Sequence, residues 1–349
     1  MIKEKVFKII RLLLFVALIF LISAFVNFLT YSPTEYHRLQ NHELGNKNAY
    51  DLVAFGSSDC RVNFDPQAAE EVLGFKCFNY GGSATTYYSG GVQASFENAL
   101  MTQSPKIVLF FVPYDLFSIP QEEMDNEAEQ IFIHSTFDMR NRFAKFKYWC
   151  IASENSGAIE RAFPWLVLLE DADVEYNVEK KLEKPYWNYD VEWRNELNSS
   201  QPYKGNGFVP YKKGDMEDLD IISKTEDIDL NQFDELDGYD LEKLLKKCKR
   251  KKIEAYVVMQ PKYRGMITHR DYLTSKRIEK IANEYGAYFV DANMLMDKNI
   301  RIDASKWNSV SHLCYDGATE YTRILCKVIA NKDKAEYYPD YETYVESLY

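Results

Sequence analysis

The chain has 349 residues, of which 46% are hydrophobic and 15% aromatic, so it can bury a sizeable core and global disorder is excluded. Its formal charge of −11 argues against nucleic acid as a partner, because binding to phosphates needs a basic surface. The six cysteines have no CxxC spacing, which excludes the usual zinc ribbons and thioredoxin-like motifs. We therefore expect no metal site and no cofactor, and we favour buried thiols over disulfides.

The N-terminus predicts a membrane anchor. Four basic residues among the first eleven precede an apolar run from Leu12 to Leu29. As a helix this run spans roughly 27 Å, close to the thickness of a bilayer core. Basic residues on the leading side place the N-terminus in the cytoplasm and the bulk of the chain outside. Residues 1–31 are thus expected to be a cytoplasmic stub and transmembrane helix, with a cleaved signal peptide as the alternative.

After a polar stretch, 32–50, interpreted as a spacer, segments with strand and helix patterns alternate. Asp65, Pro66 and Gly74 are typical of the N-cap, first residue and end of one such helix. The expected strands are 51–55, 75–80, 106–112, 253–260 and 287–292, and the expected helices are 66–73, 90–101, 240–252, 275–286 and 316–331. This alternation predicts right-handed βαβ units and a parallel sheet with helices on both faces.

The alternation is lost between residues 116 and 238, a stretch rich in acidic and aromatic residues. We interpret it as a large insertion over the carboxyl edge of the sheet, with helices near 134–150 and 157–170. The α/β domain then covers 51–335, and 336–349 is an acidic and aromatic tail.

Gly56, Ser57 and Ser58 directly follow the first expected strand, at the sheet edge where α/β proteins bind ligands. A serine nucleophile needs a base that takes its proton and donors for the oxyanion. Of the five histidines, His312 is the best candidate base, because it lies just before the last helix in "DASKWNSVSHLCYDGATEYT". Taken alone, the Gly-Ser-Ser stretch is more often a simple turn, and His312 more often a helix cap or a buried polar group.

Three short motifs occur in a characteristic order: GSS after the first strand, FN-x-G at 78–81, and S-H-L-x-x-x-G-A at 311–318. Together they resemble the SGNH/GDSL hydrolase superfamily. More narrowly, the anchor, the insertion and "KGNGFVPYKKGD" (204–215) resemble its membrane-anchored bacterial branch, which includes the teichoic-acid D-alanylation protein DltD. The resemblance implies a flavodoxin-like three-layer α/β/α fold with a central parallel sheet, the SGNH hydrolase fold.

The resemblance also implies roles for individual residues. Ser58 takes the place of the nucleophile, Ser57 that of the Asp in the GDS form, and His312 that of the general base. The backbone N–H groups of Ser58 and Gly81 take the place of the oxyanion donors.

Two departures from the superfamily pattern bear on activity. The Asn expected after the third strand is absent, and Tyr114 and Asp115 occupy that neighbourhood as candidate substrate-binding residues. The Asp expected three residues before the histidine is Ser309. Three alternatives follow: Asp303 reaches His312, a backbone carbonyl orients His312 in a dyad, or activity is low or lost.

The first functional hypothesis is an extracytoplasmic serine esterase or O-acyltransferase that acts on cell-envelope carbohydrate through a Ser58 acyl-enzyme. Its partners are an acylated carbohydrate or envelope polymer and, through the anchor, the membrane. The second is a catalytically weak scaffold that pairs with a membrane-bound O-acyltransferase. The third is a polysaccharide-binding module that uses the Trp- and Tyr-rich insertion.

Overall fold

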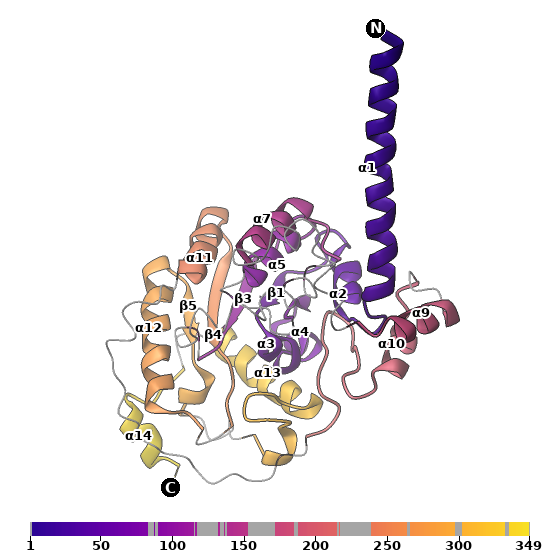
Figure 1. Cartoon of the computed structure of the whole chain (residues 1–349). Coiled ribbons are helices and arrows are strands. Elements are labelled where there is room, and N and C mark those ends of the chain that lie inside the picture. The colour runs from indigo at the N-terminus through magenta and orange to yellow at the C-terminus, as the bar shows by residue number, and fades with distance from the viewer. Residues whose placement is uncertain are drawn as a thin grey trace.

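The computed structural model describes residues 2–82, 87, 90–114, 116, 132, 136, 138–152, 172–184, 188–214, 216, 239–263, 266–296, 302–331 and 335–348. One long helix, α1 (Ile2–Thr30), projects from an α/β domain (Figure 1).

The domain is built on a five-stranded parallel sheet of order β2-β1-β3-β4-β5. The strands are β1 (Leu52–Phe55), β2 (Cys77–Asn79), β3 (Ile107–Val112), β4 (Glu254–Met259) and β5 (Tyr288–Val290). All five fall within the segments expected from the sequence. The order 2-1-3-4-5 is that of flavodoxin-like doubly wound folds, so the predicted fold class is confirmed.

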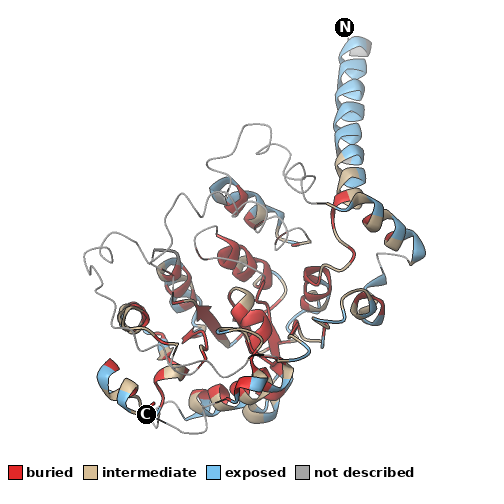
Figure 2. Cartoon of the chain, turned by 60° about the horizontal axis from the view of Figure 1, so that its bottom comes forward, coloured by how far each residue is buried: buried red, intermediate tan, exposed pale blue. Residues whose placement is uncertain are grey.

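Helices cover both faces of this sheet, because the strand side chains alternate between two buried clusters. In β3, Val108 and Phe110 belong to one cluster, whereas Leu109 and Phe111 belong to the other. The helices on the first face are α5 (Gly91–Ala99), α7 (Arg142–Ala152), α11 (Tyr239–Lys251) and α12 (His269–Tyr285). Those on the second face are α3 (Ser58–Asn63), α4 (Pro66–Leu73) and α13 (Tyr315–Ala330). Figure 2 shows the strands as buried, while most of the helices around them are buried on one side and exposed on the other.

Local sequence signals set the helix ends. The side chain of Asp65 accepts hydrogen bonds from the N–H groups of Gln67 and Ala68 at 3.0 and 3.3 Å. Pro66 is the first residue of α4, and Gly74 ends it with φ of 76°. The helix expected at 275–286 begins earlier, at His269. A capping box between Thr268 and Asp271 sets that start.

Two segments expected outside the α/β domain pack against it. Within 32–50, α2 (His37–Leu44) buries most of its residues, and Gln40 Nε2 donates to the carbonyls of Gly81 at 3.0 Å and Gly207 at 2.9 Å. The interpretation as a spacer is therefore corrected, because buried polar and apolar side chains of α2 pack against the domain. The tail contains α14 (Tyr341–Glu346), whose Tyr341 and Tyr344 join the first core cluster.

The insertion supplies α7, α9 (Val174–Glu183) and α10 (Val191–Leu197). Helix α7 overlaps the helix expected near 134–150, whereas the one expected near 157–170 lies outside the described residues. Trp149 and Trp193 are only 4% and 7% exposed, so neither presents an open ring face for sugar stacking.

Helix α1 is long and apolar enough to cross a bilayer, and none of its most apolar stretch is buried against the protein. A signal sequence meets the same criterion. All six cysteines are unpaired, and Cys150 alone among them is exposed.

Candidate active site

The structure brings Ser58 and His312 together, although 254 positions separate them in the chain. Ser58 Oγ lies 3.0 Å from His312 Nε2. Ser58 is the first residue of α3, which follows the carboxyl end of β1, and His312 lies on the loop before α13. This distance is within hydrogen-bond reach of a nucleophile and its base.

Asn63, the last residue of α3, links the helix that carries Ser58 to the loop that carries His312. Its Nδ2 donates to the carbonyl of Ser311 at 2.8 Å, and its Oδ1 accepts the N–H of Leu313 at 2.8 Å. The residues on either side of His312 are thus tied to the helix that carries Ser58. Asn63 is fully buried, so water does not compete for these bonds.

The other ring nitrogen of His312 faces a hydroxyl. Ser309 Oγ lies 3.0 Å from His312 Nδ1. Asp303 instead accepts from the N–H of Ser305 at 2.9 Å and starts a short 3-10 helix (Ala304–Lys306), and it makes no contact with His312 among the described residues. In the part of the chain that it describes, the structure therefore places neither Asp303 nor a backbone carbonyl at Nδ1. It places the Ser309 hydroxyl there, beside a pair formed by Ser58 and His312.

Asp59 lies beside the dyad and was not identified from the sequence. Its Oδ1 is 3.5 Å from His312 Nε2, and its Oδ2 accepts a hydrogen bond from Ser57 Oγ at 3.0 Å. The carboxylate therefore faces the same ring nitrogen as the nucleophile. Its position directly after Ser58 is the signal that could have revealed it.

His312 is held in its neutral form. Burial and the positive charge of Arg61 lower the pKa of its imidazole to about 4. Arg61 is itself 3% exposed, and its guanidinium donates to Gln201 Oε1 at 2.8 Å. A neutral imidazole can accept the proton of Ser58 at Nε2 when Nδ1 carries the ring hydrogen and donates it to Ser309 Oγ.

The two N–H groups expected to bind the oxyanion differ in whether they already have a hydrogen-bond acceptor in the protein. Ser58 stands at the first helical position, where a backbone N–H has no acceptor within the helix. The N–H of Gly81 donates to Asn79 Oδ1 at 2.9 Å, so it is engaged within the protein. The position of Gly81 is tight, because an added Cβ there would lie 2.5 Å from Arg61 N.

Asn79 is the residue that joins β2, α3 and the glycine loop. Its Nδ2 donates to the carbonyls of Cys60 and Phe64, both at 2.7 Å, while its Oδ1 accepts from Gly81. The side chain is fully buried. The motif FN-x-G thus supports the turn that carries Ser58.

We expect Asn79→Leu to destabilise the fold by about 3 kcal/mol or more, because each buried group left without a partner costs roughly 1–3 kcal/mol. Urea unfolding measures this loss. Asn283→Leu is the matched control, since Asn283 is exposed on α12 and should change stability by less than about 0.5 kcal/mol. Equal stability of the two variants would contradict the role given to Asn79.

Of the two candidate substrate-binding residues, Tyr114 has a structural role instead. Tyr114 is 2% exposed, and its hydroxyl donates to Asp291 Oδ1 at 2.9 Å. The expectation for Tyr114 is corrected, because the phenol satisfies a buried carboxylate that also accepts from Ser275. Asp115 lies outside the described residues.

The segment 204–214 of the insertion lies against the site. The ring of Tyr211 is 5.9 Å from that of His312, and its carbonyl accepts the N–H of Tyr315 at 2.8 Å. An added Cβ at Gly207, which has φ of 82°, would lie 1.8 Å from the carbonyl oxygen of Asn79. The close packing requires glycine there.

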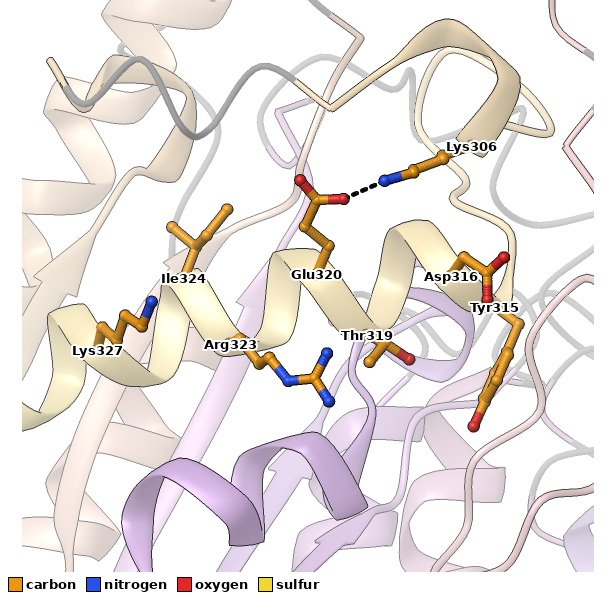
Figure 3. Close-up of a pocket in the computed structure, with 8 residues that line it drawn as sticks. All are labelled: Lys306, Tyr315, Asp316, Thr319, Glu320, Arg323, Ile324 and Lys327. Carbon is orange, nitrogen blue, oxygen red and sulfur yellow. Dashed lines mark hydrogen bonds and ion pairs between the residues drawn. The ribbon is translucent and has the colours of Figure 1, made fainter.

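A cavity of about 510 Å³ lies beside α13 and is lined by residues of that helix and by Lys306 (Figure 3). Its lining is mostly charged, and Lys306 forms an ion pair with Glu320 across it. Neither Ser58 nor His312 lines this cavity, so it is distinct from the dyad.

No protein-family model matches this chain, and no curated protein matches its sequence. Among solved structures, it is similar to one from Bacteroides fragilis that is provisionally described as an acylhydrolase. The identity is 12%, with 85% of this chain and 95% of that chain covered, and the TM-score is 0.37. At this level the similarity carries no argument about function, which must come from the site.

Proposed function

We propose that this protein is a membrane-anchored serine esterase or O-acyltransferase that acts on acylated carbohydrate of the cell envelope. The observation that carries the proposal is the 3.0 Å approach of Ser58 Oγ to a neutral, partly buried His312. A hydroxyl beside an imidazole that accepts its proton is the arrangement needed for attack on an ester carbonyl.

The reaction follows from this geometry. As Ser58 Oγ attacks the ester carbonyl, His312 Nε2 takes its proton, and the Asp59 carboxylate 3.5 Å away favours the imidazolium. When the tetrahedral intermediate collapses, Nε2 gives that proton to the departing sugar oxygen, and the acyl group remains on Ser58. Water or another sugar hydroxyl then loses a proton to Nε2 and attacks the acyl-enzyme. When the second tetrahedral intermediate collapses, the bond from the acyl carbon to Oγ breaks, and Nε2 returns its proton to Oγ, which restores Ser58 and releases the free acid or the new ester.

The location in the envelope rests on α1 and on the resemblance to the membrane-anchored branch that includes DltD. Four basic residues at the start of α1 favour a cytoplasmic N-terminus, which places the α/β domain outside the membrane. An anchored domain there meets envelope polymers rather than cytoplasmic metabolites.

An activated fluorophosphonate tests the nucleophile in the full chain held in detergent or membranes. We expect the wild type and the Ser200→Ala control, which removes an exposed hydroxyl, to be labelled, and Ser58→Ala to remain unlabelled. Labelling of Ser58→Ala at the wild-type level would exclude the acyl-enzyme.

A second function is favoured by two features of the site: the Ser309 hydroxyl at His312 Nδ1 and the engaged N–H of Gly81. A hydroxyl stabilises the imidazolium less than a carboxylate does, and an engaged N–H is not available to the oxyanion. Both features would lower the catalytic rate, as expected of a scaffold that pairs with a membrane-bound O-acyltransferase. In cells this scaffold predicts that Ser58→Ala leaves envelope acylation intact, whereas removal of residues 1–31 abolishes it. Loss of acylation in Ser58→Ala would reject the scaffold and support the enzyme.

A further inference from the structure

Helix α7 presents an apolar face that the fold does not use. Ala144, Tyr148 and Trp149 are buried on its inner side, toward α5. On its outer side, Phe143 and Phe146 are 75% and 66% exposed. Large aromatic side chains so open to water, one turn apart on a helix, indicate an interaction surface.

Helix α11, which lies on the same face of the sheet, carries a concentration of positive charge. Seven of the ten residues from Lys243 to Lys252 are Lys or Arg, in a chain whose formal charge is −11. Leu241, Leu244 and Leu245 are buried, so the basic side chains are directed outward.

A cavity of about 440 Å³ connects the two helices. Its cationic lining consists of Lys147 from α7 and Lys243, Lys246, Lys247 and Arg250 from α11. The acidic Glu97 also lines it and pairs with Lys247 at 2.8 Å and Lys147 at 3.7 Å. Lys246 also pairs with Glu242 at 3.5 Å, so five cations face two carboxylates, and the cavity keeps an excess of positive charge and space for an anionic group.

The anchor extends toward the same side of the domain as these two helices. Figure 1 shows α1 leaving the domain beside α2, α9 and α10 and pointing upward, with α7 and α11 at the top of the domain. Helix α9 holds the base of α1 firmly: Asn177 Nδ2 donates to the carbonyls of Leu29 and Thr30 at 3.1 Å, and Lys181 Nζ donates to those of Phe28 and Tyr31. Because these groups satisfy the carbonyls at the end of α1, the anchor is braced against the domain.

We propose that the outer side of α7 and the basic part of α11, here termed the α7–α11 face, rest on the bilayer and bind anionic phospholipid headgroups. Phe143 and Phe146 enter the interfacial layer, and the Lys and Arg side chains contact the phosphates. This proposal rests on the part of the proposed function that keeps α1 uncleaved as the membrane anchor. It does not depend on the chemistry of Ser58.

Cys150 provides the test, because it is exposed on the outer side of α7. The full chain is labelled there with a polarity-sensitive fluorophore and reconstituted in nanodiscs of phosphatidylcholine with or without phosphatidylglycerol. The matched control carries Cys150→Ser and Glu342→Cys, which moves the label to exposed α14 at the other end of the domain (Figure 1). Spin-labelled lipids report contact by quenching.

We expect quenching at Cys150 to exceed that of the control several-fold and to increase with phosphatidylglycerol. Replacing Lys249, Arg250 and Lys251 with glutamine should abolish the increase, while fluorophosphonate labelling of Ser58 stays unchanged. Equal quenching at both positions, or failure of the chain to enter nanodiscs, would overturn the proposal. Shielding of Cys150 only in native membranes would also overturn it and indicate a protein partner instead.

Discussion

Replacing His312 with alanine is expected to reduce the rate of Ser58 acylation by at least about 10³-fold, because it removes the imidazole nitrogen placed to take the serine proton. His312 Nε2 is 3.0 Å from Ser58 Oγ, and Asn63 fixes the loop on both sides of the ring. The measurement is the second-order rate of fluorophosphonate labelling. His269→Ala, on α12, is the control and should retain the wild-type rate.

The pH dependence of the same rate separates a catalytic His312 from a structural one. Its imidazole has a pKa lowered to about 4 by burial and by Arg61, so the base stays neutral at pH 5, where an ordinary histidine is mostly protonated. We expect the rate to fall only as the pH approaches about 4. A midpoint near 6.5 would contradict this environment.

The same shift has a consequence for stability. Between pH 6.5 and about 4 the unfolded chain binds a proton at His312 that the folded site excludes, so stability falls as the pH falls through this range. His312→Gln removes that contribution. The variant should therefore lose less stability than the wild type between these two values.

The parts of the structure that the sequence predicted are those specified by local signals. Near-continuous apolar runs such as 106–112 identify strands covered on both faces, and Asp65, Pro66 and Gly74 delimit α4. His312 is the candidate base because it lies just before the last helix, and the resemblance of three short motifs to the SGNH/GDSL superfamily pairs it with Ser58. The fold class is confirmed, and the structure places the two side chains within hydrogen-bond reach.

The parts that were missed depend on contacts between distant segments. A polar sequence such as 37–44 gives no sign that the Gln40 side chain will donate to three backbone carbonyls. Likewise, the hydrogen bonds of Asn63 and Asn79 depend on how α3 packs against the loop before α13 and against β2. Asp303 is close to His312 in sequence, which makes it a candidate partner. Its carboxylate instead accepts the N–H of Ser305, two residues further along the chain.

Ser309→Asp is the variant expected to increase activity most. A carboxylate placed at Nδ1 would hold the tautomer that accepts the Ser58 proton and would stabilise the imidazolium that forms. Loss of such a carboxylate elsewhere lowers kcat by about 10⁴, so a gain of about 10- to 10²-fold is expected where a hydroxyl already orients the ring. Ser309 Oγ lies 3.0 Å from Nδ1, so the side chain at this position already points at the ring, and the longer aspartate needs a small adjustment to seat its carboxylate there.

The pH profile identifies the cause of that gain. An added negative charge raises the pKa of His312, so the acidic midpoint of the labelling rate should move up from about 4 in Ser309→Asp. Ser309→Asn has nearly the same shape without the charge and should leave the midpoint in place. Ser309→Ala should lower the rate, since it removes the group that orients the ring. If Ser309→Asp and Ser309→Asn share one midpoint and one rate, Ser309 does not control the base, and the dyad works without support at Nδ1.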